Sequence, residues 1–155
     1  QPQRGRTMTL LRGSSSAEID AAIEQVWALV EDVARAPEWQ QGFALEVVER
    51  DPQGRPVVCD TVSDARVTKV YCRVAMSYDP PRKLSWIRLE SEDIDVMEGS
   101  WELEEIAGGR TRATYSLAVD PGPVGLMARP LEKALRPLIV GRRAGELQKA
   151  VAAGV

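Results

Sequence analysis

The chain has 155 residues, enough for one domain with a sizeable hydrophobic core and too few for two ordinary domains. Its composition, 44% hydrophobic and 28% charged, excludes a disordered chain, and no apolar run approaches the roughly 20 residues that span a bilayer. The net charge is -3 and no basic cluster is interleaved with aromatic residues, so we expect no nucleic-acid binding. We predict one domain over residues 1–155, with about the first seven residues flexible.

The stock of reactive residues excludes several common catalytic and metal sites. The chain has no histidine, and its two cysteines, Cys59 and Cys72, are far apart in sequence. A Ser-His-Asp triad, a Cys-His pair and a zinc site each need residues that are missing, so we expect neither a metal nor another cofactor. The N-terminal segment has no apolar stretch of secretory-signal length, which favours a cytoplasmic protein. Free thiols are then the expected state of the cysteines, with a disulfide as the alternative.

The first regular elements are predicted to be a strand and two short helices. The stretch "SSSAEID" alternates in polarity like a strand, and apolar residues then recur at helical spacing from Ile23 to Val30. Asp20 is a candidate N-cap for this helix. Because Pro37 disfavours helix at the residue before it, we expect the helix to end near Asp32 or Val33. A short second helix would carry "PEWQQGF".

Six strands are predicted between Ala44 and Asp120. The turn-forming segments "DPQGRP", "SDA", "DPPR", "SED" and "AGG" separate them. Because these links have hairpin length, the strands should form an antiparallel meander, and the first strand brings the sheet to seven.

Polarity predicts the register of two hairpins. Around "AGG", a three-residue loop places Ile106 opposite Arg110 and Trp101 opposite Tyr115, which leaves one face apolar and the other polar. Trp101 and Tyr115 should therefore be neighbours on the concave face of the sheet.

Around "SDA", the predicted pairing of Ser63 with Arg66 sets Cys59 opposite Val70 and Asp60 opposite Lys69. Both cysteines then lie on the apolar face as diagonal neighbours.

The C-terminal segment is predicted to form a long helix. Its apolar residues recur at steps of three and four and continue to the end of the chain: Met127, Leu131, Leu135, Leu138, Leu147 and Val151. Pro137 removes a backbone donor within this run, so the helix should bend there and shape the mouth of a cavity.

Three stretches carry a resemblance to a known family: "EIDAAIEQVWALVEDVARAPEW", "GSWELEEIAGGRTRATYSLAVDP" and "LEKALRPLIVGRRAGELQKAV". From about Ser14 to Ala152 the chain resembles the START-like, Bet v 1-like superfamily (SRPBCC), which includes the polyketide cyclase/dehydrase and lipid transport family. The resemblance implies an α+β helix-grip fold, in which a curved antiparallel seven-stranded sheet wraps around a long C-terminal helix. It also implies a deep apolar cavity, closed at one end by the two short helices.

Most of the candidate ligand-binding residues are apolar residues expected to face this cavity, and Trp39 is expected near its entrance or floor. They are Trp39, Cys72, Val74, Met76, Met97, Trp101, Tyr115, Leu117, Met127, Leu131 and Leu135. Trp27 is expected to pack the first helix onto the sheet. No catalytic residue is identified, because Tyr115 is the one clear hydroxyl in the set. Arg73 or Arg88 could receive a carboxylate or enolate if it faced inward, and the sequence leaves the phase of the strand with Trp86 and Arg88 open.

Three functions fit these observations. The favoured one is binding, transport or sequestration of a hydrophobic small molecule, such as a lipid, an isoprenoid or a polyketide-like compound, by a monomer or homodimer. The first alternative is an enzyme of the polyketide cyclase, aromatase or dehydratase type. The second is a protein-interaction module, which a well-filled cavity would favour.

Overall fold

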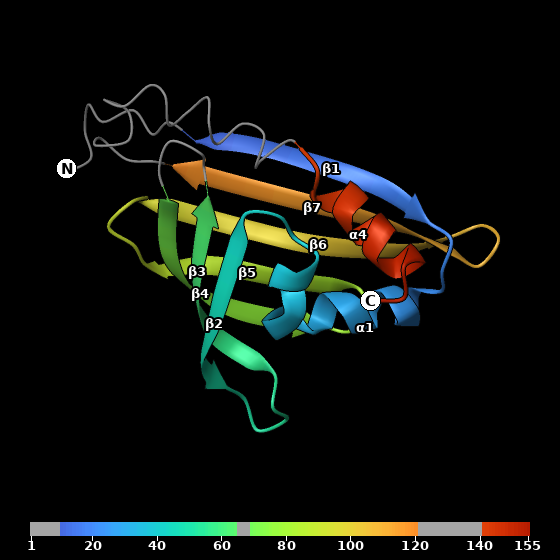
Figure 1. Cartoon of the computed structure of the whole chain (residues 1–155), viewed down its shortest axis with the longest axis horizontal. Coiled ribbons are helices and arrows are strands. Elements are labelled where there is room, and N and C mark those ends of the chain that lie inside the picture. Colours follow the sequence, from blue (N-terminus) through green and yellow to red (C-terminus); the bar gives the residue numbers. More distant parts are fainter. Residues whose placement is uncertain (1–9, 65–68, 121–140) are drawn as a thin grey trace.

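The computed structural model describes residues 10–64, 69–120 and 141–155 (Figure 1). Its elements in chain order are β1 (Leu11–Ile19), α1 (Ile23–Glu31), the 3-10 helix η1 (Val33–Glu38), β2 (Phe43–Arg50), β3 (Pro56–Asp64), β4 (Lys69–Asp79), β5 (Lys83–Glu90), β6 (Val96–Ile106), β7 (Arg110–Asp120) and α4 (Arg143–Ala152). Two short helices follow the first strand, as the sequence predicts. The second covers Val33–Glu38 and not the predicted "PEWQQGF", whose last residue, Phe43, already begins β2.

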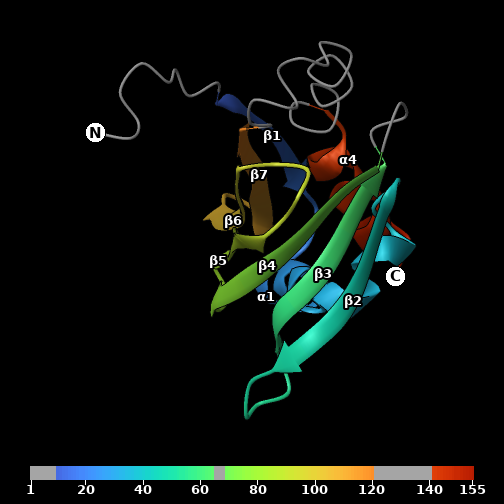
Figure 2. The same ribbon diagram turned by 90° about the vertical axis from the view of Figure 1, so that its left-hand side faces the viewer.

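The seven strands form one antiparallel sheet in the order β1-β7-β6-β5-β4-β3-β2. Strands β2 to β7 follow one another as neighbours, which confirms the predicted meander, and β1 adds to the outer side of β7. Helices α1 and α4 lie in the hollow of the curved sheet (Figure 2). The fold is therefore α+β, with its core between the concave face of the sheet and the helices.

Helix α1 turns an apolar face toward the sheet. Its buried residues are Ile23, Val26, Trp27, Leu29 and Val30. Trp27 is 6% exposed, and its indole N–H donates to Glu31 Oε2 at 3.0 Å. An aromatic side chain of this size supplies a large share of the apolar area that a short helix buries.

The start of α1 differs from the prediction. The N-cap position is Ala22, and no side chain caps the helix. Asp20 lies two residues earlier, and its carboxylate accepts a hydrogen bond from Arg110 in β7, so its prediction as N-cap was wrong. The end of α1 at Glu31 agrees with the prediction, and Pro37 lies inside η1.

The "AGG" hairpin has the predicted register. Ile106 pairs with Arg110 and Trp101 with Tyr115. Gly108 and Gly109 adopt positive φ angles of 81° and 69°, which glycine tolerates without strain. The polar face carries an ion pair between Glu104 and Arg112, with a distance of 2.8 Å.

The predicted register of the "SDA" hairpin was wrong. Cys59 pairs with Val74 and Asp60 with Arg73, so β4 is shifted by four residues from the expected pairing. An even shift keeps the same side chains on each face, so polarity alone cannot separate the two registers. Arg73 makes a two-pronged ion pair with Asp60, at 2.7 and 3.0 Å, that the predicted register does not allow.

The C-terminal helix is shorter than predicted. Helix α4 begins at Arg143, after a turn and a bend at Gly141 and Arg142, where glycine disfavours a continuing helix. A long helix that runs unbroken to Ala152 is therefore not what the structure shows. The remainder of the predicted helix falls in residues 121–140, so the bend at Pro137 lies outside the described residues, as do residues 1–9.

Helix α4 packs over the β1 side of the sheet. It buries Ala144, Leu147 and Ala150, and its contacts are with β1, β7 and α1. The Gln148 side-chain amide donates to the carbonyl of Glu18 in β1 at 2.8 Å. No helix in the described part of the chain is both long and apolar enough to cross a membrane.

Thr111 provides a test of how β7 holds the connection between β1 and α1. Its side chain is fully buried, and its hydroxyl donates to the carbonyl of Ala21 at 2.8 Å. Replacing it in Thr111→Val leaves that carbonyl without its partner, and we expect a loss of about 1–3 kcal/mol in the free energy of unfolding, measured in urea. Thr114→Val is the matched control, because Thr114 bonds to Ser16 on the outer face, where water can replace the lost partner. Equal losses in the two variants would contradict this role.

Candidate functional site

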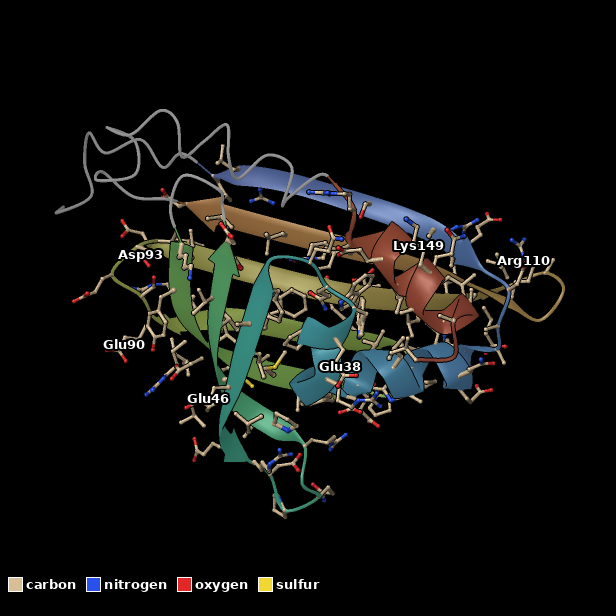
Figure 3. All side chains as sticks on the ribbon, in the orientation of Figure 1. Glu38, Glu46, Glu90, Asp93, Arg110 and Lys149 are labelled. Atoms are coloured by element: carbon tan, nitrogen blue, oxygen red, sulfur yellow. The ribbon has the colours of Figure 1, made fainter. Side chains whose placement is uncertain are left out.

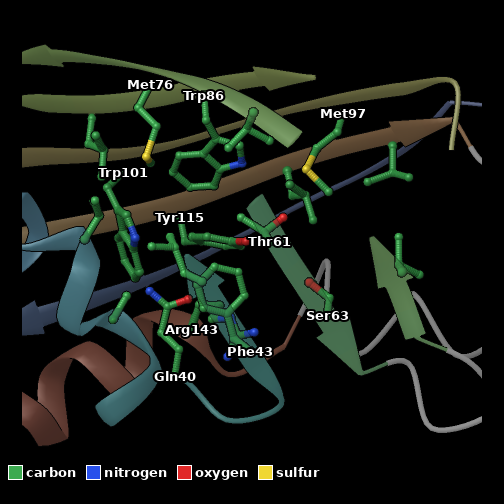
Figure 4. A pocket seen from close by; sticks show the side chains of 18 of the residues that line it. Gln40, Phe43, Thr61, Ser63, Met76, Trp86, Met97, Trp101, Tyr115 and Arg143 are labelled. Atoms are coloured by element: carbon green, nitrogen blue, oxygen red, sulfur yellow. The ribbon is translucent and has the colours of Figure 1, made fainter. Parts of the chain in front are cut away.

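An apolar cavity of about 80 Å³ lies between the concave face of the sheet and the helices. Strands β2 to β7 line it, together with α1, η1 and the first residue of α4. In Figure 4, Trp86 and Trp101 project from one wall, and Gln40, Phe43 and Arg143 from the wall that faces it. The alternation of side chains along β5 and β6 brings Trp86 and Trp101 to the concave face of the sheet, whereas Gln40 and Arg143 come from the segment after η1 and from α4.

Six of the candidate ligand-binding residues line this cavity: Val74, Met76, Met97, Trp101, Tyr115 and Leu117. Two others lie outside the lining. Trp39 packs behind Trp101, with ring centroids 6.0 Å apart, and Cys72 is fully buried beside the wall. Met127, Leu131 and Leu135 fall outside the described residues. A ligand-binding role for any of these residues stays a prediction.

Four aromatic rings form a continuous cluster along the cavity. The centroid of Trp101 lies 6.0 Å from that of Trp39 and 5.0 Å from that of Tyr115, and Trp86 lies 5.8 Å from Tyr115. All three pairs are tilted, an arrangement that aromatic rings favour over face-to-face stacking. The predicted contact between Trp101 and Tyr115 is thereby confirmed.

The indole N–H of Trp39 is an unusual member of this cluster. It is buried and has no hydrogen-bond partner, the only such side-chain polar atom found in the described residues. A buried donor left in this state costs roughly 1–3 kcal/mol. The ring is therefore held in place by packing and not by its polar atom.

Trp86 owes its position to the absence of a side chain at Gly99. The two residues are paired across β5 and β6, and the indole lies directly over the glycine. A Cβ atom at residue 99 would overlap the ring carbons of Trp86. Trp86 therefore fits against the sheet, where it faces the cavity and contacts Tyr115. The structure also settles the phase of β5, because Ile87 and Leu89 point outward with 54% and 48% exposure.

Arg143 is the charged residue of the site, and it is not among the residues predicted from the sequence. Its side chain is 9% exposed, and its Nη1 donates to Glu146 Oε1 at 2.7 Å and to the carbonyl of Gln41 at 2.9 Å. Glu146 Oε2 accepts from the backbone N–H of Gln41 at 3.0 Å. The pair thus joins the start of α4 to the connection between η1 and β2. Residue 143 precedes Leu147 by one helical turn, so the two side chains lie on the same face of α4. This spacing could have predicted from the sequence that Arg143 is buried.

The other arginines considered from the sequence do not reach the cavity. Arg73 lies on the outer face with Asp60, and that carboxylate raises its pKa. Arg88 shares the phase of Trp86, but its guanidinium donates to the carbonyls of Ile94 and Ser91, at 2.9 Å each, and holds the link between β5 and β6. Of the described residues that line the cavity, Arg143 alone is charged.

The remaining charged side chains lie mainly on the surface. Figure 3 labels six that project outward, away from the cavity: Glu38, Glu46, Glu90, Asp93, Arg110 and Lys149. Within the described ranges, no three carboxylates or thiols are grouped so that they could hold a metal ion.

Five polar side chains line the cavity, Gln40, Thr61, Ser63, Tyr115 and Arg143, and the last two supply hydrogen-bond donors. Burial raises the pKa of Tyr115, and the nearby Arg143 guanidinium offsets only part of this rise. The phenol is therefore protonated at neutral pH and available as a donor. Thr61 is already engaged, because its hydroxyl donates to the carbonyl of Cys72 at 2.9 Å. The site can therefore hold an apolar molecule and offer donors to it at one wall.

A curved antiparallel sheet that encloses an apolar cavity beneath helices defines a START-like domain in architecture. The family model described as polyketide cyclase / dehydrase and lipid transport matches residues 11–153, and the chain belongs to this family. No curated protein matches the chain.

Solved structures share this fold at low sequence identity. A START superfamily protein from Mycobacterium smegmatis is 17% identical with a TM-score of 0.72, and the match covers 93% of this chain and 99% of that one. A protein from Thermus thermophilus is 21% identical with a TM-score of 0.74 and the same coverage. The Zhui aromatase/cyclase from a Streptomyces species is 16% identical with a TM-score of 0.71, covering 94% and 93%. At these identities, the likeness extends to the fold alone.

Gly99→Ala tests the close approach of Trp86 to the sheet. The added methyl group must push the indole away or shift β6, so we expect the free energy of unfolding to fall by about 1–3 kcal/mol. Gly145→Ala is the control, because a Cβ there meets nothing within 4 Å, and in helix α4 it should add about 0.5–1 kcal/mol. The measurement is urea unfolding followed by circular dichroism. A Gly99→Ala variant as stable as the parent protein would show that the ring has room to move.

The two cysteines should be unreactive in the folded protein. Both are free and fully buried, and burial raises the pKa of each thiol to about 11. The thiolate is the reactive form of cysteine. At pH 8, iodoacetamide should therefore alkylate the folded protein about tenfold more slowly than the protein unfolded in guanidinium. Mass spectrometry of timed samples measures both rates. A thiol modified equally fast in both states would contradict its burial.

Proposed function

We propose that this protein binds a hydrophobic small molecule in the cavity and carries or sequesters it. The supporting observation is the character of the lining, in which aromatic and aliphatic side chains surround one charged residue. Binding pockets for small molecules typically combine an apolar lining with a few polar groups that orient the ligand. The family's description, which includes lipid transport, agrees with this function.

The size of the cavity sets a condition on binding. About 80 Å³ is less than the roughly 150 Å³ of an engineered cavity that accepts benzene, so a lipid or polyketide-like molecule requires side chains to move. Met76 and Met97 line the cavity and are only partly buried. Methionine is unbranched and adapts its shape readily, so these two residues are the best suited to yield to a ligand.

A cyclase or aromatase activity is the second candidate. It is favoured by the fold shared with the Zhui aromatase/cyclase and by the polar pair Tyr115 and Arg143 in an otherwise apolar cavity. A phenol with a raised pKa serves as an acid or a hydrogen-bond donor, and not as a base at neutral pH. In this function, the two residues would hold a keto or enol oxygen while the carbon chain folds.

Displacement of an apolar dye tests the binding function. We expect N-phenylnaphthylamine to bind the purified protein and to be released by hydrophobic competitors. In Leu117→Trp, the larger side chain occupies the cavity, and dye affinity should fall about tenfold or more, equivalent to roughly 1.4 kcal/mol. Ile87→Trp adds the same ring on the outer face and should leave the affinity unchanged. Equal dye binding by both variants and the parent protein would rule out the cavity as the binding site.

A further inference from the structure

The charge of Arg143 is already neutralised inside the protein. Its guanidinium lies 2.7 Å from the Glu146 carboxylate, and the two side chains are 9% and 12% exposed. Its Nη1 donates to the Gln41 carbonyl and to Glu146, and the guanidinium is also hydrogen-bonded to the Tyr115 hydroxyl. A guanidinium has five N–H groups, so these described partners do not use all of them. The cavity wall therefore presents N–H donors without a net charge.

A second donor stands beside this pair. Tyr115 is buried in the cavity wall, and the Arg143 guanidinium is close enough to its hydroxyl to lower the pKa that burial raises. The cavity lining therefore brings together N–H and O–H donors from α4 and β7, with Phe43 packed 5.8 Å from the guanidinium carbon. The two Glu146 carboxylate oxygens beside these donors accept from the Gln41 N–H and from Arg143.

We infer that the ligand is an uncharged apolar molecule with a carbonyl oxygen, which accepts hydrogen bonds from Arg143 and Tyr115 while the apolar part lies along Trp86, Met76 and Met97. This inference rests on the proposed binding function and specifies the ligand's chemistry.

Two other ligand classes fit the wall less well. A pure hydrocarbon would displace water from these N–H and O–H donors and accept no hydrogen bond from them, which leaves buried polar groups unsatisfied. A ligand carboxylate would bind beside an Arg143 guanidinium that is already paired with Glu146, so a net negative charge would be buried. A carbonyl satisfies the donors and adds no charge.

Three probes of matched shape separate these classes: acetophenone, α-methylstyrene and benzoate. They have the same number of non-hydrogen atoms. The group attached to the ring is an acetyl group in acetophenone, an isopropenyl group in α-methylstyrene and a carboxylate in benzoate. Isothermal titration, or competition with the dye, gives each affinity. We expect acetophenone to bind about tenfold more tightly than either other probe, because a hydrogen bond from a charged donor contributes about that factor.

Glu146→Gln should change the preference. With the carboxylate removed, Arg143 carries an uncompensated charge, so benzoate should gain about tenfold or more and overtake acetophenone. Glu24→Gln makes the same change of charge at an exposed position of α1 and should leave all three affinities as they are. Because Glu146 is nearly buried, Tyr115→Phe serves as an independent test that keeps the ring. It should weaken acetophenone and leave α-methylstyrene unchanged.

The outcomes distinguish this inference from the proposed function. If α-methylstyrene binds as tightly as acetophenone, or benzoate binds best to the parent protein, the carbonyl assignment is wrong and apolar binding in the cavity stands. Dye binding without binding of any probe has the same meaning. If neither the dye nor any probe binds, both the inference and the proposed function fail.

Discussion

The pairing of β6 with β7 determines which side chains face the interior of this protein. Trp101 lies opposite Tyr115 in that pairing, and a slip of one residue would turn the aromatic residues outward and bury Glu102. The same order continues into the neighbouring strands, with Ser15 of β1 opposite Tyr115 and Trp86 of β5 opposite Gly99. The apolar wall of the cavity therefore depends on the registers of neighbouring strand pairs, which place these side chains on the same face of the sheet.

The Arg143–Glu146 pair connects this wall to the helices. A buried ion pair is weak evidence for stability, because removing two charges from water offsets much of their attraction. Here the pair also binds both the N–H and the carbonyl of Gln41, so it fixes α4 relative to the segment that enters β2. A specific geometry is therefore the clearest contribution of this pair, and the same atoms present donors to the cavity.

The sequence predicts most of this fold, because its strongest signals are local. The "AGG" hairpin is correct to the residue, since its short loop and its polarity allow one register. The "SDA" hairpin is wrong by four residues, because an even shift leaves the faces unchanged and the decisive contact between Asp60 and Arg73 spans two strands. Of the site, the apolar lining from the strands was predictable, whereas Arg143 was not among the candidates named from the sequence. Its burial depends on where α4 docks, which periodicity within the helix indicates only in part.

The aromatic cluster gives the cavity an optical consequence. Three of the four tryptophans, Trp39, Trp86 and Trp101, belong to one connected group of rings, with neighbouring centroids no more than 6.0 Å apart. Indole transitions at such separations couple to one another, so this group, in which Trp86 and Trp101 line the cavity, contributes to the near-ultraviolet circular dichroism of the protein. The fourth, Trp27, is buried on α1 and has no ring contact with this group among the described residues. The protein therefore carries its own spectroscopic reporter of whether the cavity is occupied, without any added label.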